Sequence, residues 1–159
     1  MSMEDLSSVL WRERELLETL LFKLEVEQLV LATGRTRWLA PAAREVEEVL
    51  DAIRETELLR GLTADALALE LGLDPNPSLL DIADACDEPW RSIWLDHRET
   101  FTAVSAEITE MAANNRELLT SGYQAAKATL LSLSDQPGTY AADGTAVSAR
   151  RTSLVDRSI

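Results

Sequence analysis

The feature that most constrains the fold is a long helical periodicity between residues 90 and 133. Large, mostly apolar residues recur there at intervals of three, four or seven positions. They are Trp90, Trp94, His97, Phe101, Val104, Ile108, Asn115, Leu119, Tyr123, Ala126, Leu130 and Leu133. A repeat of 3.6 residues per turn places these side chains on one face of a helix about 67 Å long. Gly122 is its weak point, since glycine costs about 1 kcal/mol relative to alanine.

A first helix is expected at the N-terminus. It is predicted to begin at Ser2, which forms a capping-box pattern with Asp5, and to run to about Ala32, with Gly34 as its stop. Its apolar face consists of Leu6, Leu10, Leu17, Leu20, Leu21, Leu24 and Leu31. A leucine face of this kind is typical of a helix that packs into a core.

A second helix is expected to begin between Thr36 and Pro41, to reach Gly61, and to resume over residues 63–73. Its apolar face consists of Leu39, Val46, Val49, Leu50, Ile53 and Leu58. The sequence DPNP at 74–77 ends this region, because proline is excluded from the interior of a helix.

A short helical insert is expected before the long last helix. Ser78 with Asp81 forms a second capping pattern, which predicts a short helix. Asp87 or Glu88 is expected to cap the last helix, with Pro89 in its first turn.

Composition supports an all-α protein. Hydrophobic residues make up 46% of the chain and charged residues 27%, which is typical of a globular domain. Alanine, leucine, glutamate and arginine, which favour helices, are abundant. We therefore expect a long-helix antiparallel coiled-coil-like bundle over residues 1–135, with three long helices and a short helical insert. Residues 136–159 lack periodicity and are expected to be a flexible C-terminal tail.

The charge argues against several partners. The net charge is −13, and residues 1–135 hold 12 basic and 26 acidic side chains. Such a body repels phosphate backbones and anionic lipids, so we expect no nucleic-acid binding. No apolar run is long enough for membrane insertion, the acidic N-terminus lacks a signal-peptide pattern, and the single cysteine excludes a disulfide framework. The expected location is the cytoplasm.

The sequence offers no catalytic or metal-ligating pattern. The one histidine, His97, lies in the apolar face between Trp94 and Phe101, which favours a structural role. Metal sites in helix bundles use a glutamate three residues before a histidine, and that position is Trp94. Cys86 has no nearby partner and is expected to be a small core residue. We therefore expect no enzyme, no cofactor and no metal.

The lengths of the helices raise a question about the end of the last one. The first helix would span about 42 Å and the last about 67 Å, so up to about 25 Å lacks a full-length neighbour. The apolar face nevertheless continues to Leu133. The helix could break at Gly122 and fold back, residues 61–88 could cover the face, two copies could pair through it, or it could receive a helix of another protein.

Three segments of the chain resemble the FlgN family of flagellar export chaperones. They are residues 16–60, residues 113–133 and the tail segment TYAADGTAVS at 139–148. The most specific parts are the asparagine and paired leucines between Asn115 and Leu119, and the tyrosine and glycine of the tail, Tyr140 and Gly144. The order of the helices and the aromatic–glycine tail also fits this family.

The resemblance implies a cytosolic, all-α, non-enzymatic chaperone. It would bind the C-terminal segments of the hook-associated proteins of the hook–filament junction, prevent their premature assembly and deliver them to the export apparatus. The client-binding residues would be Leu118, Leu119, Tyr123, Ala126, Leu130 and Leu133. Tyr140 would contact the export gate, while the role of residues 63–87 stays open. The alternative is a structural coiled-coil homodimer or an adaptor without an export role.

Overall fold

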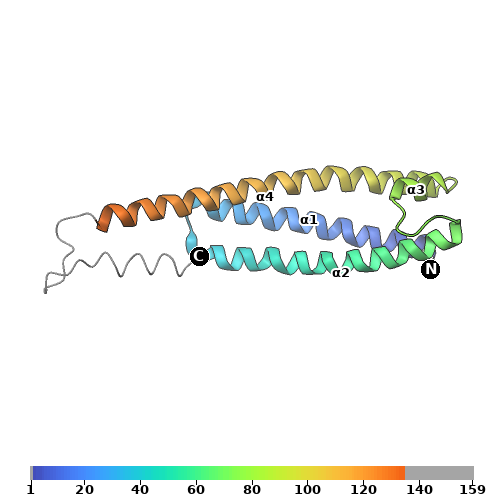
Figure 1. Ribbon diagram of the computed structural model, residues 1–159, viewed down its shortest axis with the longest axis horizontal. Coiled ribbons are helices and arrows are strands. Elements are labelled where there is room, and N and C mark those ends of the chain that lie inside the picture. Colours follow the sequence, from blue (N-terminus) through green and yellow to red (C-terminus); the bar gives the residue numbers. More distant parts are fainter. Residues whose placement is uncertain (1, 135–159) are drawn as a thin grey trace. The chain divides into compact units, whose positions relative to one another are not determined.

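The computed structural model describes residues 2–134 and is built from helices (Figure 1). They are α1 (Met3–Thr33), the short 3-10 helix η1 (Thr36–Trp38), α2 (Leu39–Leu71), α3 (Leu79–Asp84) and α4 (Trp90–Ser134). No strand occurs within residues 2–134. The prediction of three long helices with a short helical insert is confirmed.

The chain divides into two compact units, Met1–Asn115 and Arg116–Ile159. The boundary lies inside α4, and each unit is described by itself below. The expected domain over residues 1–135 contains the whole first unit and the described part of the second. The expected tail, residues 136–159, lies outside the described residues.

The predicted ends of α1 are confirmed by its capping contacts. The backbone N–H of Asp5 donates to Ser2 Oγ at 3.2 Å, and the backbone N–H of Ser2 donates to Asp5 Oδ2 at 2.7 Å. The backbone N–H of Ser2, and after it the Ser2 hydroxyl, which donates to Asp5 Oδ2 at 3.0 Å, hold the pKa of the Asp5 carboxyl below its ordinary value. At the other end Gly34 has φ 68°, a left-handed conformation that glycine adopts without strain.

Side-chain contacts define how the long helices of the first unit run. Arg60 pairs with Glu13 and Glu45 pairs with Lys23, so α2 is antiparallel to α1. Arg14 contacts Asp96 near the start of α4, and further along α1 a backbone carbonyl contacts Asn115. The first part of α4 therefore runs in the same direction as α1, which gives an up–down–up bundle (Figure 1).

Two apolar clusters form the core of the first unit. One joins the start of α1, the end of α2, α3 and the start of α4 through Leu6, Leu10, Leu67, Leu79, Ile82, Ala83, Cys86 and Trp94. The other lies further along α1 and α2 and contains Leu20, Leu24, Val46, Val49 and Ile53, with Ile108, Met111 and Ala112 of α4 against it. The prediction that Cys86 is a small core residue is consistent with its burial.

The structure corrects the predicted second helix in two respects. α2 continues through Gly61 without a break and ends at Leu71, with Gly72 as its left-handed cap. Residues 63–71 are therefore part of a long bundle helix and not of an insert.

The buried face of α2 also differs from the prediction. Leu58 was assigned to the apolar face, but it is exposed, and the next two buried positions after Ile53 are Thr56 and Thr63. Both hydroxyls donate to backbone carbonyls four residues earlier, so threonine can occupy buried positions there.

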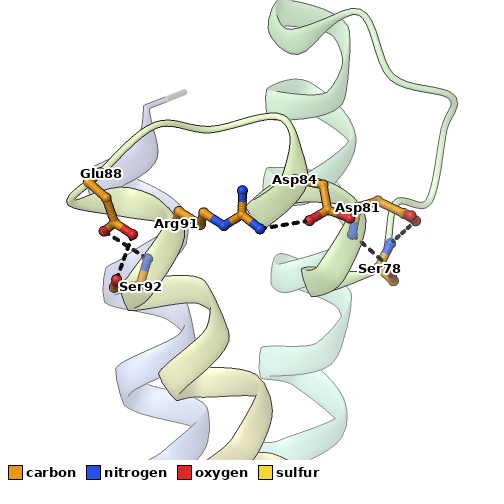
Figure 2. Close-up of polar contacts among 6 residues, drawn as sticks. All are labelled: Ser78, Asp81, Asp84, Glu88, Arg91 and Ser92. Carbon is orange, nitrogen blue, oxygen red and sulfur yellow. Dashed lines mark hydrogen bonds and ion pairs between the residues drawn. The ribbon is translucent and has the colours of Figure 1, made fainter.

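The connection around α3 is held by polar contacts (Figure 2). As predicted, Ser78 and Asp81 form a capping box. Arg91 of α4 pairs with Asp84 at 3.6 Å. Glu88 fulfils the expected capping role, because its carboxylate accepts from the backbone N–H of Ser92 at 3.3 Å and from its hydroxyl at 2.8 Å. The expected place of Pro89 in the first turn is corrected, because α4 begins at Trp90 and Pro89 directly precedes it.

Candidate functional site

The candidate site is the helical segment 116–134, the described part of the second unit. Every residue from 116 to 133 is exposed, including the large apolar ones. α4 is helical through Gly122, so the predicted alternative of a break there is wrong. The apolar residues Leu67, Leu79 and Ile82 pack in the first unit's core and residues 116–133 are exposed, so the alternative in which residues 61–88 cover the C-terminal face is also not supported.

One face of this segment is apolar along its length. We call it the 119–133 stripe, and it consists of Leu119, Tyr123, Ala126, Leu130 and Leu133. The steps of four, three, four and three residues keep these side chains on one side of the helix. The exposed fractions of its four large side chains lie between 38% and 51%. An exposed apolar face of this kind is typical of a protein-interaction site.

Two further leucines border the stripe on opposite sides. Leu118 is one of the client-binding residues that the family resemblance implied, and it is exposed. Leu131 is 55% exposed and was missed, because it falls outside the three-and-four spacing of the stripe. With Leu131, the exposed apolar surface at the end of α4 is wider than the 119–133 stripe.

Asn115 is the last residue of the first unit, and it is buried. Its side-chain Nδ2 donates to the backbone carbonyl of Leu24 at 2.9 Å and to Glu27 Oε1 at 3.2 Å. A buried amide with two partners fixes the position of α4 along α1 at this point. The asparagine that contributed to the family resemblance therefore has a structural role in the first unit.

A buried polar layer separates the two apolar clusters, and the sequence did not reveal it. Glu13 is buried, and both of its carboxylate oxygens accept from Arg60 Nη1, at 3.2 and 3.1 Å. Burial raises the pKa of Glu13 more than the attraction of Arg60 lowers it. The Arg60 guanidinium also lies over the ring of Phe101, 5.1 Å from its centroid.

His97 also lies in this layer, and it is buried, as its place in the apolar face of α4 predicted. Its ring stacks with Phe101 and meets Trp11 edge to face, and its Nδ1 lies 3.4 Å from Arg14 Nη1. Because arginine can only donate, Nδ1 accepts and the proton of the neutral ring is on Nε2. Burial, followed by the positive charge of Arg14, lowers the pKa of His97, while Asp96 opposes this shift.

We predict that the histidine titrates below pH 6.5. The chain has one histidine, so its ring protons give a single NMR titration curve. A lowered folded-state pKa means that the native state binds fewer protons than the unfolded state between the two pKa values. Neutral His97 therefore contributes to the free energy of unfolding above pH 6.5, and this contribution is lost as the pH falls through the folded-state pKa. In His97→Gln this part of the dependence of stability on pH should disappear. A pKa of His97 at or above 6.5 by NMR would contradict the prediction that burial lowers it.

Within residues 2–134 the side chains do not form a cluster of three or more metal-ligating groups. In the same part of the chain, each helix is too short or too polar to cross a membrane. The remaining sequence-predicted contact residue, Tyr140, lies outside the described residues.

Comparison with known proteins gives one match. A family model described as FlgN protein matches residues 1–148, which include the whole first unit, the 119–133 stripe and Tyr140. Searches of curated proteins and of solved structures found no match to this chain.

Proposed function

Because the chain belongs to the FlgN family of flagellar export chaperones, we propose that the end of α4 is the surface that binds its clients. The clients in this proposal are the hook-associated proteins of the hook–filament junction, and the bound parts are their C-terminal segments. The protein would act in the cytoplasm, prevent premature assembly of these clients and deliver them to the export apparatus.

The observation that carries this proposal is the exposure of the 119–133 stripe. Junction proteins assemble through their terminal segments, so a chaperone must cover those segments with apolar surface. A client segment with apolar residues at helical spacing fits such a helix face. The acidic residues of the chain, which give it a net charge of −13, keep it soluble while this face is exposed.

Three large side chains are proposed as the anchors of the client. Leu119, Tyr123 and Leu130 lie along the stripe, and large side chains at the centre of a desolvated surface usually dominate binding energy. Apart from its two chain neighbours and the backbone of its own helix, a Cβ added at Gly122 would meet no atom within 4 Å among the described residues. Together with Ala126, Gly122 leaves room for the client backbone to approach the helix closely.

The competing function is a structural homodimer in which two copies pair through the same stripe. Multi-angle light scattering with and without a synthetic peptide of a client C-terminus separates the two functions. We expect the mass of one chain without the peptide, and an increase by one peptide mass with it. A dimer mass that Leu130→Asp converts to a monomer mass, with no peptide bound, would assign the stripe to self-association.

We also propose that the C-terminal tail contacts the export gate through Tyr140. Its aromatic ring supplies much of the apolar area in a segment rich in small residues. Deletion of residues 136–159 should leave the affinity for the client peptide unchanged but reduce client secretion, and Tyr140→Ala should reproduce much of that reduction. Normal client secretion by the Tyr140→Ala variant would contradict the proposed contact between Tyr140 and the export gate.

A further inference from the structure

The outer side of α2 carries large apolar side chains that the client proposal does not use. Leu58, Leu62 and Leu69 are 74%, 65% and 82% exposed, more than any side chain of the 119–133 stripe. Their spacing of four and then seven residues places them on one face of the helix. That face lies opposite the buried positions of α2, which include Val49 and Leu67. We call these three leucines the outer α2 surface.

A glycine beside these leucines has no explanation within the described chain. Gly61 lies in the interior of α2, where glycine costs about 1 kcal/mol relative to alanine. It is not among the residues with a positive φ, so the backbone does not require glycine. A Cβ at this position would meet nothing within 4 Å, so packing inside residues 2–134 does not require it either. A glycine here lets the backbone of another molecule approach α2 closely.

The charged side chains that border the outer α2 surface without an ion-pair partner in the described part of the chain are acidic. The two arginines nearby are already engaged, Arg54 with Asp51 at 2.7 Å and Arg60 with Glu13 at 3.1 Å. The exposed carboxylates Glu55, Glu57 and Asp65 form no ion pair within the described part of the chain. One oxygen of Asp65 accepts from the backbone N–H of Asn76 at 2.6 Å. The surface is therefore apolar at its centre and acidic at its edges.

We propose that the outer α2 surface binds an amphipathic helix of a protein partner that carries lysine or arginine beside its apolar face. Apolar residues of that helix would pack on the leucines and beside Gly61, and its cations would pair with Glu55 and Glu57. A second copy of this chain fits less well, because its acidic edges would meet the same acidic edges and each copy carries a net charge of −13. The surface lies in the first unit, so this proposal stands independently of client binding by residues 116–134.

A designed peptide provides the test. The probe is an 18-residue peptide with leucine at every third or fourth position and lysine between, and its control is a scrambled peptide of the same composition. Binding is measured by fluorescence anisotropy, and the site is located by amide chemical shifts of the full-length protein. We expect shifts along α2 from 55 to 69, and an affinity at least about tenfold above that of the scrambled peptide.

Variants of exposed residues separate this surface from general attraction to an acidic protein. Leu62→Ser should weaken binding of the designed peptide by about tenfold, whereas Leu29→Ser, at a 60% exposed leucine of α1, should weaken it less than about twofold. Glu55→Gln with Glu57→Gln should reduce both the affinity and its dependence on salt. Circular dichroism should show unchanged folding of each variant, because none of the four side chains is buried.

Three results would overturn the proposal. Equal affinities for Leu62→Ser and Leu29→Ser would place the peptide elsewhere, as would amide shifts confined to residues 116–134. A doubling of the protein's mass that Leu62→Ser abolishes would assign the outer α2 surface to a second copy of the chain.

Discussion

Leu24→Ala is expected to lower the free energy of unfolding by about 2–5 kcal/mol, because it removes a buried side chain from the middle of the bundle. Leu24 is only 6% exposed and packs in a cluster with Val46, Val49 and Ile53 of α2. The cost combines the lost burial of the leucine with the cavity that its neighbours cannot fill. Urea denaturation followed by circular dichroism measures the change.

The matched variant is Leu130→Ala, which removes the same atoms from the exposed stripe. Leu130 is 38% exposed in the free protein, so we expect a loss below about 1 kcal/mol. Comparable decreases in the denaturation midpoint of both variants would show that Leu130 is ordinary core. The proposal that the 119–133 stripe is left exposed for a client would then be wrong.

The helices of the first unit could largely be predicted because their sequence signals are local. The capping pairs at Ser2 and Ser78 and the stop at Gly34 each depend on residues a few positions apart, and all three are confirmed. Gly61 was misread as an end of the second helix. A glycine inside a helix costs about 1 kcal/mol, and the packing of residues on both sides of it, such as Ile53 and Leu67, outweighs that cost.

The buried polar layer could not be predicted, because it depends on contacts between residues far apart in the chain. Glu13 occurs among other acidic residues of α1, and only its contact with Arg60 explains why it is buried. Arg14 and Asp96 likewise meet only once α1 and α4 are packed. By contrast, the burial of His97 was predicted, since it lies in a continuous apolar face of one helix.

The apolar stripe of the candidate site could be predicted from its spacing, but its exposure could not. The spacing from Leu119 to Leu133 is the same as that of the buried residues Trp94 and His97 earlier in α4. Periodicity shows which side chains share a face, and it does not show what covers them. The comparison of helix lengths and the family resemblance, and not the spacing itself, indicated that this part of the face is not covered.

Leu130→Asp is expected to lower the affinity for a client C-terminal peptide by more than about 2 kcal/mol, roughly thirtyfold. In the proposed complex residue 130 is desolvated against apolar client side chains, so an aspartate there would be buried without a partner. In the free protein residue 130 is 38% exposed, so the same aspartate remains hydrated and folding should be unaffected. The loss should therefore appear in binding and not in stability.

Lys127→Asp is the matched control, because residue 127 lies in the same helical segment but outside the stripe. This substitution changes the net charge by two, whereas Leu130→Asp changes it by one. General electrostatic repulsion would therefore weaken the control at least as much as the test variant. We expect instead that Leu130→Asp weakens client binding much more than Lys127→Asp, which should change the affinity only slightly.

Isothermal titration calorimetry of a client C-terminal peptide against the wild type and both variants shows whether the 119–133 stripe binds the client. We expect one bound peptide per chain, an affinity at least about thirtyfold lower for Leu130→Asp, and an affinity close to that of the wild type for Lys127→Asp. Equal affinities for Leu130→Asp and the wild type would contradict this expectation and would place the client on another surface of the protein.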